Sequence, residues 1–176
     1  MIDYTKQISD SLVFRKARID DVPEVGVILR DAVERMLAEG KLQWDKSYPN
    51  DTHVRSDIDH GVGYVMEIDG TVIAYAAVVF TGEPAYDTID GEWLTDGKYV
   101  VVHRLAVSKS MKRQGIGRTF LTVVADYARS LGIHSFRIDT NFDNDAMLGL
   151  LPNLGFSYCG EIKYEKGCRK AFEKII

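Results

Sequence analysis

Long apolar runs, cysteines and a strong excess of one charge are all scarce in this sequence. No hydrophobic stretch approaches the roughly 20 residues that a membrane-spanning helix needs, and Met1–Lys6 lacks the apolar core of a signal peptide. The net charge of −4 provides no overall field that would attract nucleic acid or an acidic membrane. These absences predict a cytoplasmic protein that binds neither nucleic acid nor membrane.

The two cysteines, Cys159 and Cys168, are too few for a disulfide framework or a zinc site. In a tight hairpin built around Lys166-Gly167, the two positions would not face each other. No histidine or reactive motif lies beside them in the sequence. We therefore expect free thiols that pack rather than react, and no metal site.

The chain does contain enough apolar material for one well-buried core. Its 176 residues, 45% of them hydrophobic, suit a single domain spanning 1–176. Strand and helix signals alternate after residue 99, which predicts an α/β fold with parallel pairing. Apolar periodicity and turn residues predict helices at 20–40, 51–59, 115–131 and 144–154, and strands at 12–18, 62–68, 72–80, 99–107, 134–140, 156–164 and 171–176.

The stretch 81–97 interrupts this pattern with acidic and aromatic residues, and we expect it to form a long functional loop.

The most informative segment joins the strand at 99–107 to the helix at 115–131. Gly115 and Gly117 lie at the start of that helix, beside three cations, Lys112, Arg113 and Arg118. Backbone N–H groups at a helix start have no partner in the helix, and the helix dipole adds positive potential there. The turn is therefore suited to a phosphate or pyrophosphate. A glycine turn with a solvated basic rim is the alternative.

Two familiar nucleotide motifs are absent from this segment. It lacks the Gly-x-x-x-x-Gly-Lys-[Ser/Thr] form of a phosphate-binding NTPase loop. It also lacks the third glycine of a dinucleotide-binding fingerprint. ATP and NAD are therefore disfavoured as ligands.

The segment resembles the signature of the GNAT family, the GCN5-related N-acetyltransferases, which is [Arg/Gln]-x-x-Gly-x-[Gly/Ala] after a strand written Leu-x-Val. The chain reads Leu105-Ala106-Val107 and then Lys112-Arg113-Gln114-Gly115-Ile116-Gly117. Lys112 stands where the family has Arg or Gln, which keeps a charge for phosphate but alters any backbone-ordering role. A second stretch, from Asn144 to Leu154-Gly155-Phe156, is similar to the family's Asn…Leu-Gly-Phe landmark.

This resemblance implies the GNAT fold, a mixed central sheet flanked by helices. It implies an N-acetyltransferase that uses acetyl-CoA, without a metal, to acetylate a primary amine by direct attack in a ternary complex. We expect a small-molecule acceptor rather than a protein, although an aminoglycoside, a polyamine, an amino acid and a protein N-terminus all stay open. A homodimer is compatible with this fold and activity. The rival is a GNAT-like module that binds CoA or acyl-CoA without turnover.

The resemblance also implies which residues bind the cofactor. Strand backbone would pair with the pantetheine arm, the glycine turn would hold the pyrophosphate, and two asparagines would contact the arm. Helix capping is an equal explanation for Asn144. The implied residues are Leu105, Ala106, Val107, Lys112, Arg113, Gln114, Gly115, Ile116, Gly117, Arg118, Thr119, Asn141 and Asn144.

The catalytic candidates are His103 and Tyr158. His103 lies on the strand just before the implied thioester site, and a neutral imidazole is a suitable base near pH 7. A histidine hydrogen-bonded within the sheet is the alternative. The family's usual tyrosine acid corresponds here to Leu151, so Tyr158 is a substitute candidate, against a packed strand tyrosine.

Aromatic residues on two connecting segments are candidates for the acceptor site. Trp44, Tyr48 and Trp93, with nearby acidic residues, would form a pocket for a cationic amine. The alternative is that these aromatics fasten their loops to the core.

Overall fold

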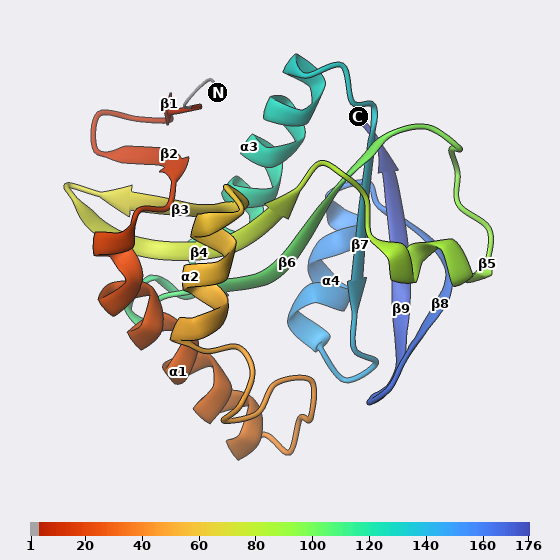
Figure 1. The fold of residues 1–176 in the computed structure, drawn as a ribbon, viewed down its shortest axis with the longest axis horizontal. Coiled ribbons are helices and arrows are strands. Elements are labelled where there is room, and N and C mark those ends of the chain that lie inside the picture. Colours follow the sequence, from red (N-terminus) through yellow and green to blue (C-terminus); the bar gives the residue numbers. More distant parts are fainter. Residues whose placement is uncertain (1–3) are drawn as a thin grey trace. The chain divides into compact units, whose positions relative to one another are not determined.

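The computed structural model describes residues 4–176, which divide into two compact units (Figure 1). Unit 1 consists of the chain up to Val78 together with His103–Val123, and unit 2 of Val79–Val102 with Val124–Ile176. The expectation drawn from Met1–Lys6 rests partly on residues outside the described range. Across residues 4–176 no helix is long and apolar enough to cross a membrane.

Unit 1 combines antiparallel strands with helices. Its strands pair in the order β1-β2-β3-β4, and helices α1 and α2 pack against each other (Figure 1). The last part of β6 and the first part of α3 also belong to it. The elements are β1 Lys6–Gln7, β2 Leu12–Lys16, α1 Val22–Ala38, α2 Asp51–Asp59, β3 Gly63–Ile68, β4 Thr71–Val79, β6 Tyr99–Val107 and α3 Ile116–Ser130.

Local signals explain the boundaries of two of these elements. Asp69 and Gly70 take left-handed backbone angles, which suit the tight turn that joins β3 to β4. Helix α2 begins after Asn50, whose side chain accepts the N–H of Thr52 at 3.0 Å. Both elements confirm the prediction, because each turn or cap is encoded by the residues at the boundary.

Helix α1 begins without a side-chain cap, although Asp20 and Asp21 directly precede it. A 3₁₀ turn, Ile19–Asp21, precedes it, and neither acid caps α1 through its side chain. Asp21 instead accepts two bonds from the Arg15 guanidinium, at 2.8 and 2.9 Å, and the N–H of Arg18 at 2.6 Å. The ion pair with Arg15, six residues earlier in the chain, therefore occupies the Asp21 carboxylate.

The core of unit 1 is an apolar cluster between its helices and strands. Trp44 belongs to it although it lies on the connection between α1 and α2. Its buried members are Ala17, Val22, Val25, Ile28, Leu29, Ala32, Val33, Trp44, Val54, Val65, Val72, Tyr75 and Ala106.

Unit 2 contains the first part of β6 and the last part of α3, and its strands lie in the order β6-β7-β9-β8-β5. Strands β6 and β7 are parallel, which confirms the predicted pairing, and the other pairs are antiparallel. Strand β9 begins four residues before the predicted start at 171, since its register continues through the hairpin to Gly167. The elements are β5 Asp90–Gly91, β7 Ser135–Thr140, α4 Asp145–Asn153, β8 Ser157–Tyr164 and β9 Gly167–Ile175.

Strand β5 approaches β8 very closely. Gly91 lies opposite Gly160. A Cβ on Gly91 would lie 2.1 Å from the carbonyl oxygen of Cys159, and one on Gly160 would lie 2.3 Å from that of Asp90. Both glycines have positive φ, of 148° and 144°. This pairing therefore requires glycine at both positions.

The loop 92–97 is fastened by a buried carboxylate. Glu173, with no exposed surface, accepts the N–H of Leu94 at 2.5 Å and hydroxyls of Thr95 and Ser135 at 2.6 and 2.5 Å. Burial by itself raises the pKa of Glu173, but these bonds and the Arg137 charge outweigh burial and hold the pKa below its usual value. The second half of the expected functional loop is thus tied to β7 and β9.

Cys159 and Cys168 are free, as predicted. In the β8–β9 hairpin Cys168 lies opposite Lys163 rather than opposite Cys159. Burial raises the pKa of Cys159, which makes its thiol less reactive.

Candidate active site

The glycine turn lies in unit 1 between β6 and α3. After β6 the chain forms a 3₁₀ turn, Lys109–Met111, and then an exposed turn at 112–115. Arg113 and Gly115 both have left-handed φ, of 62° and 79°. A Cβ on Gly115 would meet nothing within 4 Å, so the space beside this glycine is open.

The start of α3 leaves several N–H groups outside its hydrogen-bond ladder. The hydrogen-bond ladder of α3 begins with the Thr119 N–H, which donates to the Gly115 carbonyl at 2.9 Å. The first N–H groups of an α-helix generally have no acceptor within the helix. They lie at the positive end of the helix dipole, beside an open glycine turn. The residues present therefore fit a pyrophosphate.

Cations surround this turn, and one of them was missed by the sequence reasoning. Lys112, Arg113 and Arg118 are exposed, as the motif suggested. Desolvation and the nearby charge of Arg35, with a smaller effect of Arg113, lower the pKa of Lys112. Arg35 belongs to α1, and Lys109 reaches Asp31 of the same helix at 3.9 Å. No local motif marks Arg35, because only the packing of α1 brings it to the turn.

A buried polar cluster lies where β6 belongs to unit 1, and we name its members Arg104, Asp57, Tyr75 and Tyr48 the Arg104 cluster. The Arg104 guanidinium donates two bonds to Asp57, at 2.6 and 3.1 Å, and one to the Tyr48 hydroxyl at 3.0 Å. The Tyr75 hydroxyl donates to Asp57 at 2.5 Å. Burial, followed by the Asp57 charge, raises the pKa of Tyr75 well above its usual value, so this phenol stays protonated.

Two candidate groups lie on β6 beside this cluster. His103 is half-buried and directly precedes Arg104. Of the three residues expected to bind the pantetheine arm through their backbone, Ala106 is buried, and Leu105 and Val107 are half-buried. The roles of His103 and of Leu105–Val107 stay predictions.

The two asparagines belong to unit 2. The Asn144 side chain accepts the N–H of Met147 at 3.3 Å and caps α4, so the capping explanation holds for this residue. Asn141 donates to the Asp143 carboxylate at 2.7 Å. A contact of either asparagine with the cofactor stays a prediction.

The expected aromatic acceptor pocket needs correction at Trp44, whereas the role of Trp93 in it stays a prediction. Trp44 is only 6% exposed and packs in the core of unit 1, so its indole cannot wall an open pocket. Trp93, in unit 2, donates to the Tyr86 carbonyl at 3.0 Å. The Arg137 guanidinium lies 4.4 Å from the centre of the Trp93 ring and 4.0 Å from the centre of the Tyr99 ring. Both tryptophans fasten their loops, because burying a large aromatic surface is favourable. Tyr48 is half-buried and bonded to Arg104.

Tyr158 lies on β8, which is separated from β7 by β9. Its ring is 55% exposed and contacts Phe172 edge-on at 5.7 Å. The acid role of Tyr158 stays a prediction. Leu151 is fully buried in α4.

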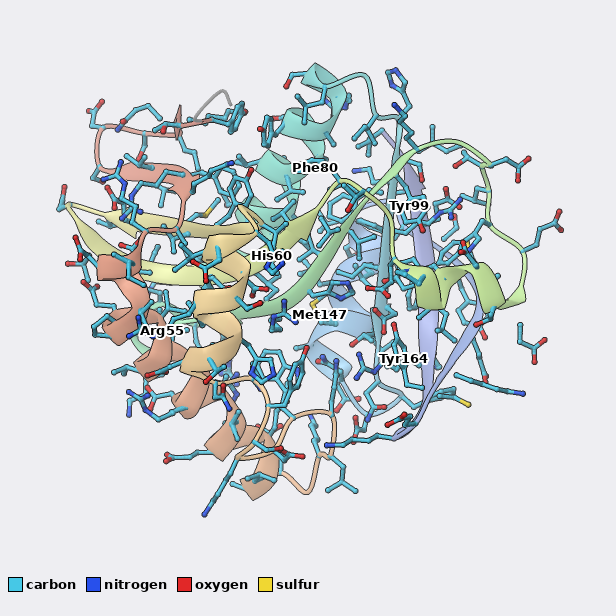
Figure 2. All side chains as sticks on the ribbon, viewed as in Figure 1. Arg55, His60, Phe80, Tyr99, Met147 and Tyr164 are labelled. Atoms are coloured by element: carbon cyan, nitrogen blue, oxygen red, sulfur yellow. The ribbon has the colours of Figure 1, made fainter. Side chains whose placement is uncertain are left out.

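Two further tyrosines in unit 2 escaped the sequence reasoning. The Tyr86 hydroxyl donates to Asp139 at 2.8 Å, and Arg169 contacts the same carboxylate at 3.2 Å and the Tyr164 ring at 4.5 Å (Figure 2). Burial, followed by the Asp139 charge, raises the pKa of both phenols above the usual value. A raised pKa makes a phenol a weaker acid, so these two are poorly suited to protonate a leaving thiolate.

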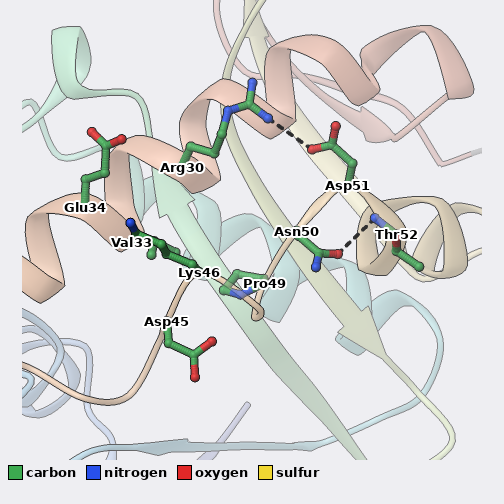
Figure 3. Close-up of a pocket in the computed structure, with 9 residues that line it drawn as sticks. All are labelled: Arg30, Val33, Glu34, Asp45, Lys46, Pro49, Asn50, Asp51 and Thr52. Carbon is green, nitrogen blue, oxygen red and sulfur yellow. Dashed lines mark hydrogen bonds and ion pairs between the residues drawn. The ribbon is translucent and has the colours of Figure 1, made fainter.

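Unit 1 also contains a cavity of about 410 Å³ beside the start of α2 (Figure 3). An ion pair between Arg30 and Asp51, at 3.3 Å, crosses from α1 to α2 at its edge. Carboxylates and cations both line it, together with apolar surface from side chains such as those of Val33 and Pro49. The lining residues are Arg30, Val33, Glu34, Asp45, Lys46, Pro49, Asn50, Asp51 and Thr52.

Comparisons with known proteins bear on the family. Residues 30–156, more than half of the chain, match the Acetyltransferase (GNAT) family. No curated protein matches the sequence significantly. Among solved structures, a GNAT-family acetyltransferase from Streptococcus agalactiae is 31% identical, with a TM-score of 0.86 over 94% of this chain and 95% of that one.

Two more distant structures share the fold. A GNAT-family acetyltransferase from Listeria monocytogenes is 19% identical, with a TM-score of 0.75 over 98% of this chain and 100% of that one. YncA from Salmonella typhimurium, solved with its cofactor acetyl-CoA, is 19% identical, with a TM-score of 0.62 over 94% of each chain. By the family match and the 31% identity, the chain belongs to the GNAT family of acetyltransferases.

Proposed function

We propose that this protein is an N-acetyltransferase that transfers the acetyl group of acetyl-CoA to a primary amine by direct attack in a ternary complex. The observation that carries the proposal is the open glycine turn at the start of α3, with the exposed cations around it. Membership of an acetyltransferase family supports the reaction, and the acetyl-CoA present in YncA supports the cosubstrate.

Within this proposal, the chain binds and orients both substrates. The N–H groups from Gln114 to Thr119 hold the pyrophosphate, and Lys112, Arg113 and Arg118 add charge. The backbone of Leu105–Val107 binds the pantetheine arm and donates an N–H to the thioester carbonyl. Acetyl-CoA supplies an activated acyl group that a neutral amine can attack.

His103 is the proposed base that accepts the proton of the incoming amine, directly or through one water. No side chain is assigned as the acid. A thiol has an ordinary pKa of about 8.5, so the thiolate is a fair leaving group without one.

We propose a small molecule as the acceptor. The cavity beside α2, about 410 Å³, falls in the size range of small-ligand sites. Its carboxylates, Glu34 and Asp45, would suit an amine or its polar neighbours. A cytoplasmic location, and a monomer or homodimer that binds neither nucleic acid nor membrane, complete the proposal and rest on composition alone.

Release of free thiol from acetyl-CoA, measured with a panel of small primary amines and peptide N-termini, tests the function. We expect amine-dependent release above the background hydrolysis, with the acetylated amine found by mass spectrometry. Tight binding of CoA without release for any amine would instead support a CoA-binding module.

A further inference from the structure

Arg104 has a backbone conformation that a strand residue rarely adopts. Its φ is +58°, in the left-handed region that is unfavourable for any residue with a Cβ. The alternation of β6 breaks at this point, where His103, Arg104 and Leu105 are half-buried in succession. Such a conformation persists only where surrounding contacts hold it.

The Arg104 cluster supplies those contacts from three other segments. Asp57 lies on α2 and Tyr75 on β4, while Tyr48 lies on the connection between α1 and α2. The guanidinium bonds through all three of its nitrogens, two of them to one carboxylate in a forked arrangement. The side chains of Arg104 and Asp57 are only 15% and 9% exposed, so solvent screens the pair weakly.

The partners of Arg104 are themselves held in place. The Asp57 carbonyl accepts the N–H of Val62 at 2.8 Å, and Tyr48 and Asp45 exchange two backbone bonds of 2.9 and 3.1 Å. Arg104 is therefore fixed at its side chain by ordered segments while its own backbone is strained.

We propose that Arg104 is a positioning residue: its bonds to Asp57 and Tyr48 hold residue 104 in the left-handed conformation and so aim the backbone N–H and C=O groups of Leu105. The inference rests on the proposed function, in which that backbone meets the thioester. It assigns Arg104 no contact with either substrate.

Three substitutions separate this role from a general contribution to stability. Arg104→Ala removes the bonds and keeps the Cβ, so the backbone should relax. Arg104→Gly also removes the bonds, but glycine enters the left-handed region freely. Arg104→Lys keeps the charge without the forked geometry.

We expect kcat to be at least 30-fold lower in R104A than in the parent. In R104G, kcat should be at least threefold higher than in R104A. In R104K, kcat should lie between the values of R104A and the parent. The Kd for CoA should change by a smaller factor than kcat in all three, because the glycine turn that holds the pyrophosphate is unaltered. A purely stabilising role predicts a lower Tm in the variants but an unchanged kcat for the molecules that stay folded. Equal kcat in R104A and R104G, or glycine below alanine, would overturn the inference.

The Arg15–Asp21 pair provides a matched control. It is also buried and doubly bonded, at 2.8 and 2.9 Å, and lies in unit 1. Arg15→Ala should lower Tm but leave kcat within twofold of the parent. A 30-fold loss of kcat in R15A as well would show that any broken buried pair has this effect, and would overturn the positioning role.

A second readout does not depend on turnover. Crystal structures of the variants should show a negative φ at residue 104 in R104A and a positive φ in R104G. A positive φ retained in R104A would show that the bonds do not hold the backbone. If the parent protein releases no thiol from acetyl-CoA with any amine, the proposed function fails. The structures of R104A and R104G still decide whether the Arg104 bonds hold residue 104 in the left-handed conformation.

Discussion

Gly117 is the residue that tests the proposed cofactor site most directly. It lies in the first turn of α3, where a branched side chain would occupy the space that a pyrophosphate must approach. We expect Gly117→Val to weaken CoA binding more than tenfold, or at least about 1.4 kcal/mol. Isothermal titration calorimetry with CoA checks this.

Gly149→Val is the matched control, because Gly149 is an exposed helical glycine in α4 whose added Cβ would meet nothing within 4 Å. Its CoA affinity should stay that of the parent. A folded G117V variant with parental affinity would remove the glycine turn from the cofactor site.

His103 carries the riskiest residue-level prediction. General-base assistance contributes about 100- to 10,000-fold, so His103→Ala should lower turnover at least tenfold and leave CoA affinity nearly unchanged. A base works only when it is unprotonated, so parental turnover should fall at acid pH. The pH–rate profile of H103A should lack this acid limb. Full turnover with the limb intact would make His103 structural.

The location of the glycine turn was predictable, because neighbouring residues in the sequence encode it. Gly115 and Gly117 lie at the start of a helix beside exposed cations, as the motif suggested, and their roles toward a cofactor stay predictions. The burial of Trp44 and the left-handed φ of Arg104 were not predictable, because both depend on segments far away in the chain. An arginine in a strand pattern gives no signal of positive φ, which is why sequence reasoning missed the Arg104 cluster.

At the scale of elements, the 92–97 loop depends on Glu173. Glu173→Gln removes the charge that pairs with Arg137 at 3.3 Å and should destabilise the fold by on the order of 3 kcal/mol at pH 7. Thermal unfolding measures this, and hydrogen exchange of 92–97 should rise with it. The exposed acid Glu165 provides a control, since Glu165→Gln should change Tm little.

This destabilisation should also depend on pH in a defined direction. The folded pKa of Glu173 is lowered, so its ionisation stabilises the fold above the unfolded carboxyl pKa of about 4.3, and this contribution is lost as the pH falls through the folded value. The difference in stability between the parent and E173Q should therefore be full at pH 7 and shrink below about pH 4. A constant difference from pH 7 to pH 3 would contradict the assignment.

Helices and strands with a strong hydrophobic pattern in the sequence matched their predicted ranges. Short strands that are defined only by hydrogen bonding to a neighbouring strand did not. Helix α2 spans the predicted residues, whereas the two-residue strands β1 and β5 have no periodicity that a sequence pattern could show. Strand β5 exists only because two glycines allow its approach to β8. The stretch 81–97, expected as a loop, therefore contains a strand.

At the scale of the whole molecule, an acidic protein is proposed to bind an anionic cosubstrate. The net charge of −4 opposes CoA at long range, so the cations around the glycine turn must supply the attraction locally. Replacing Lys112, Arg113 and Arg118 together by Gln should weaken CoA binding and reduce its dependence on salt. Titrations at several ionic strengths measure both, and an unchanged salt response would argue against direct contact.

The fold class was predictable at this scale because two separated motifs and the order of elements agree. The expectation of a single domain from length alone stays a prediction beside the two compact units.

The facing glycines at 91 and 160 affect whether copies of the protein associate with one another. The short β5 occupies backbone positions along the outer side of β8, the kind of open strand edge through which sheets of different molecules join. A side chain at either glycine would push β5 away and uncover that edge. The damage would then appear as association that grows with protein concentration, in a chain whose individual molecules still fold and bind their ligands.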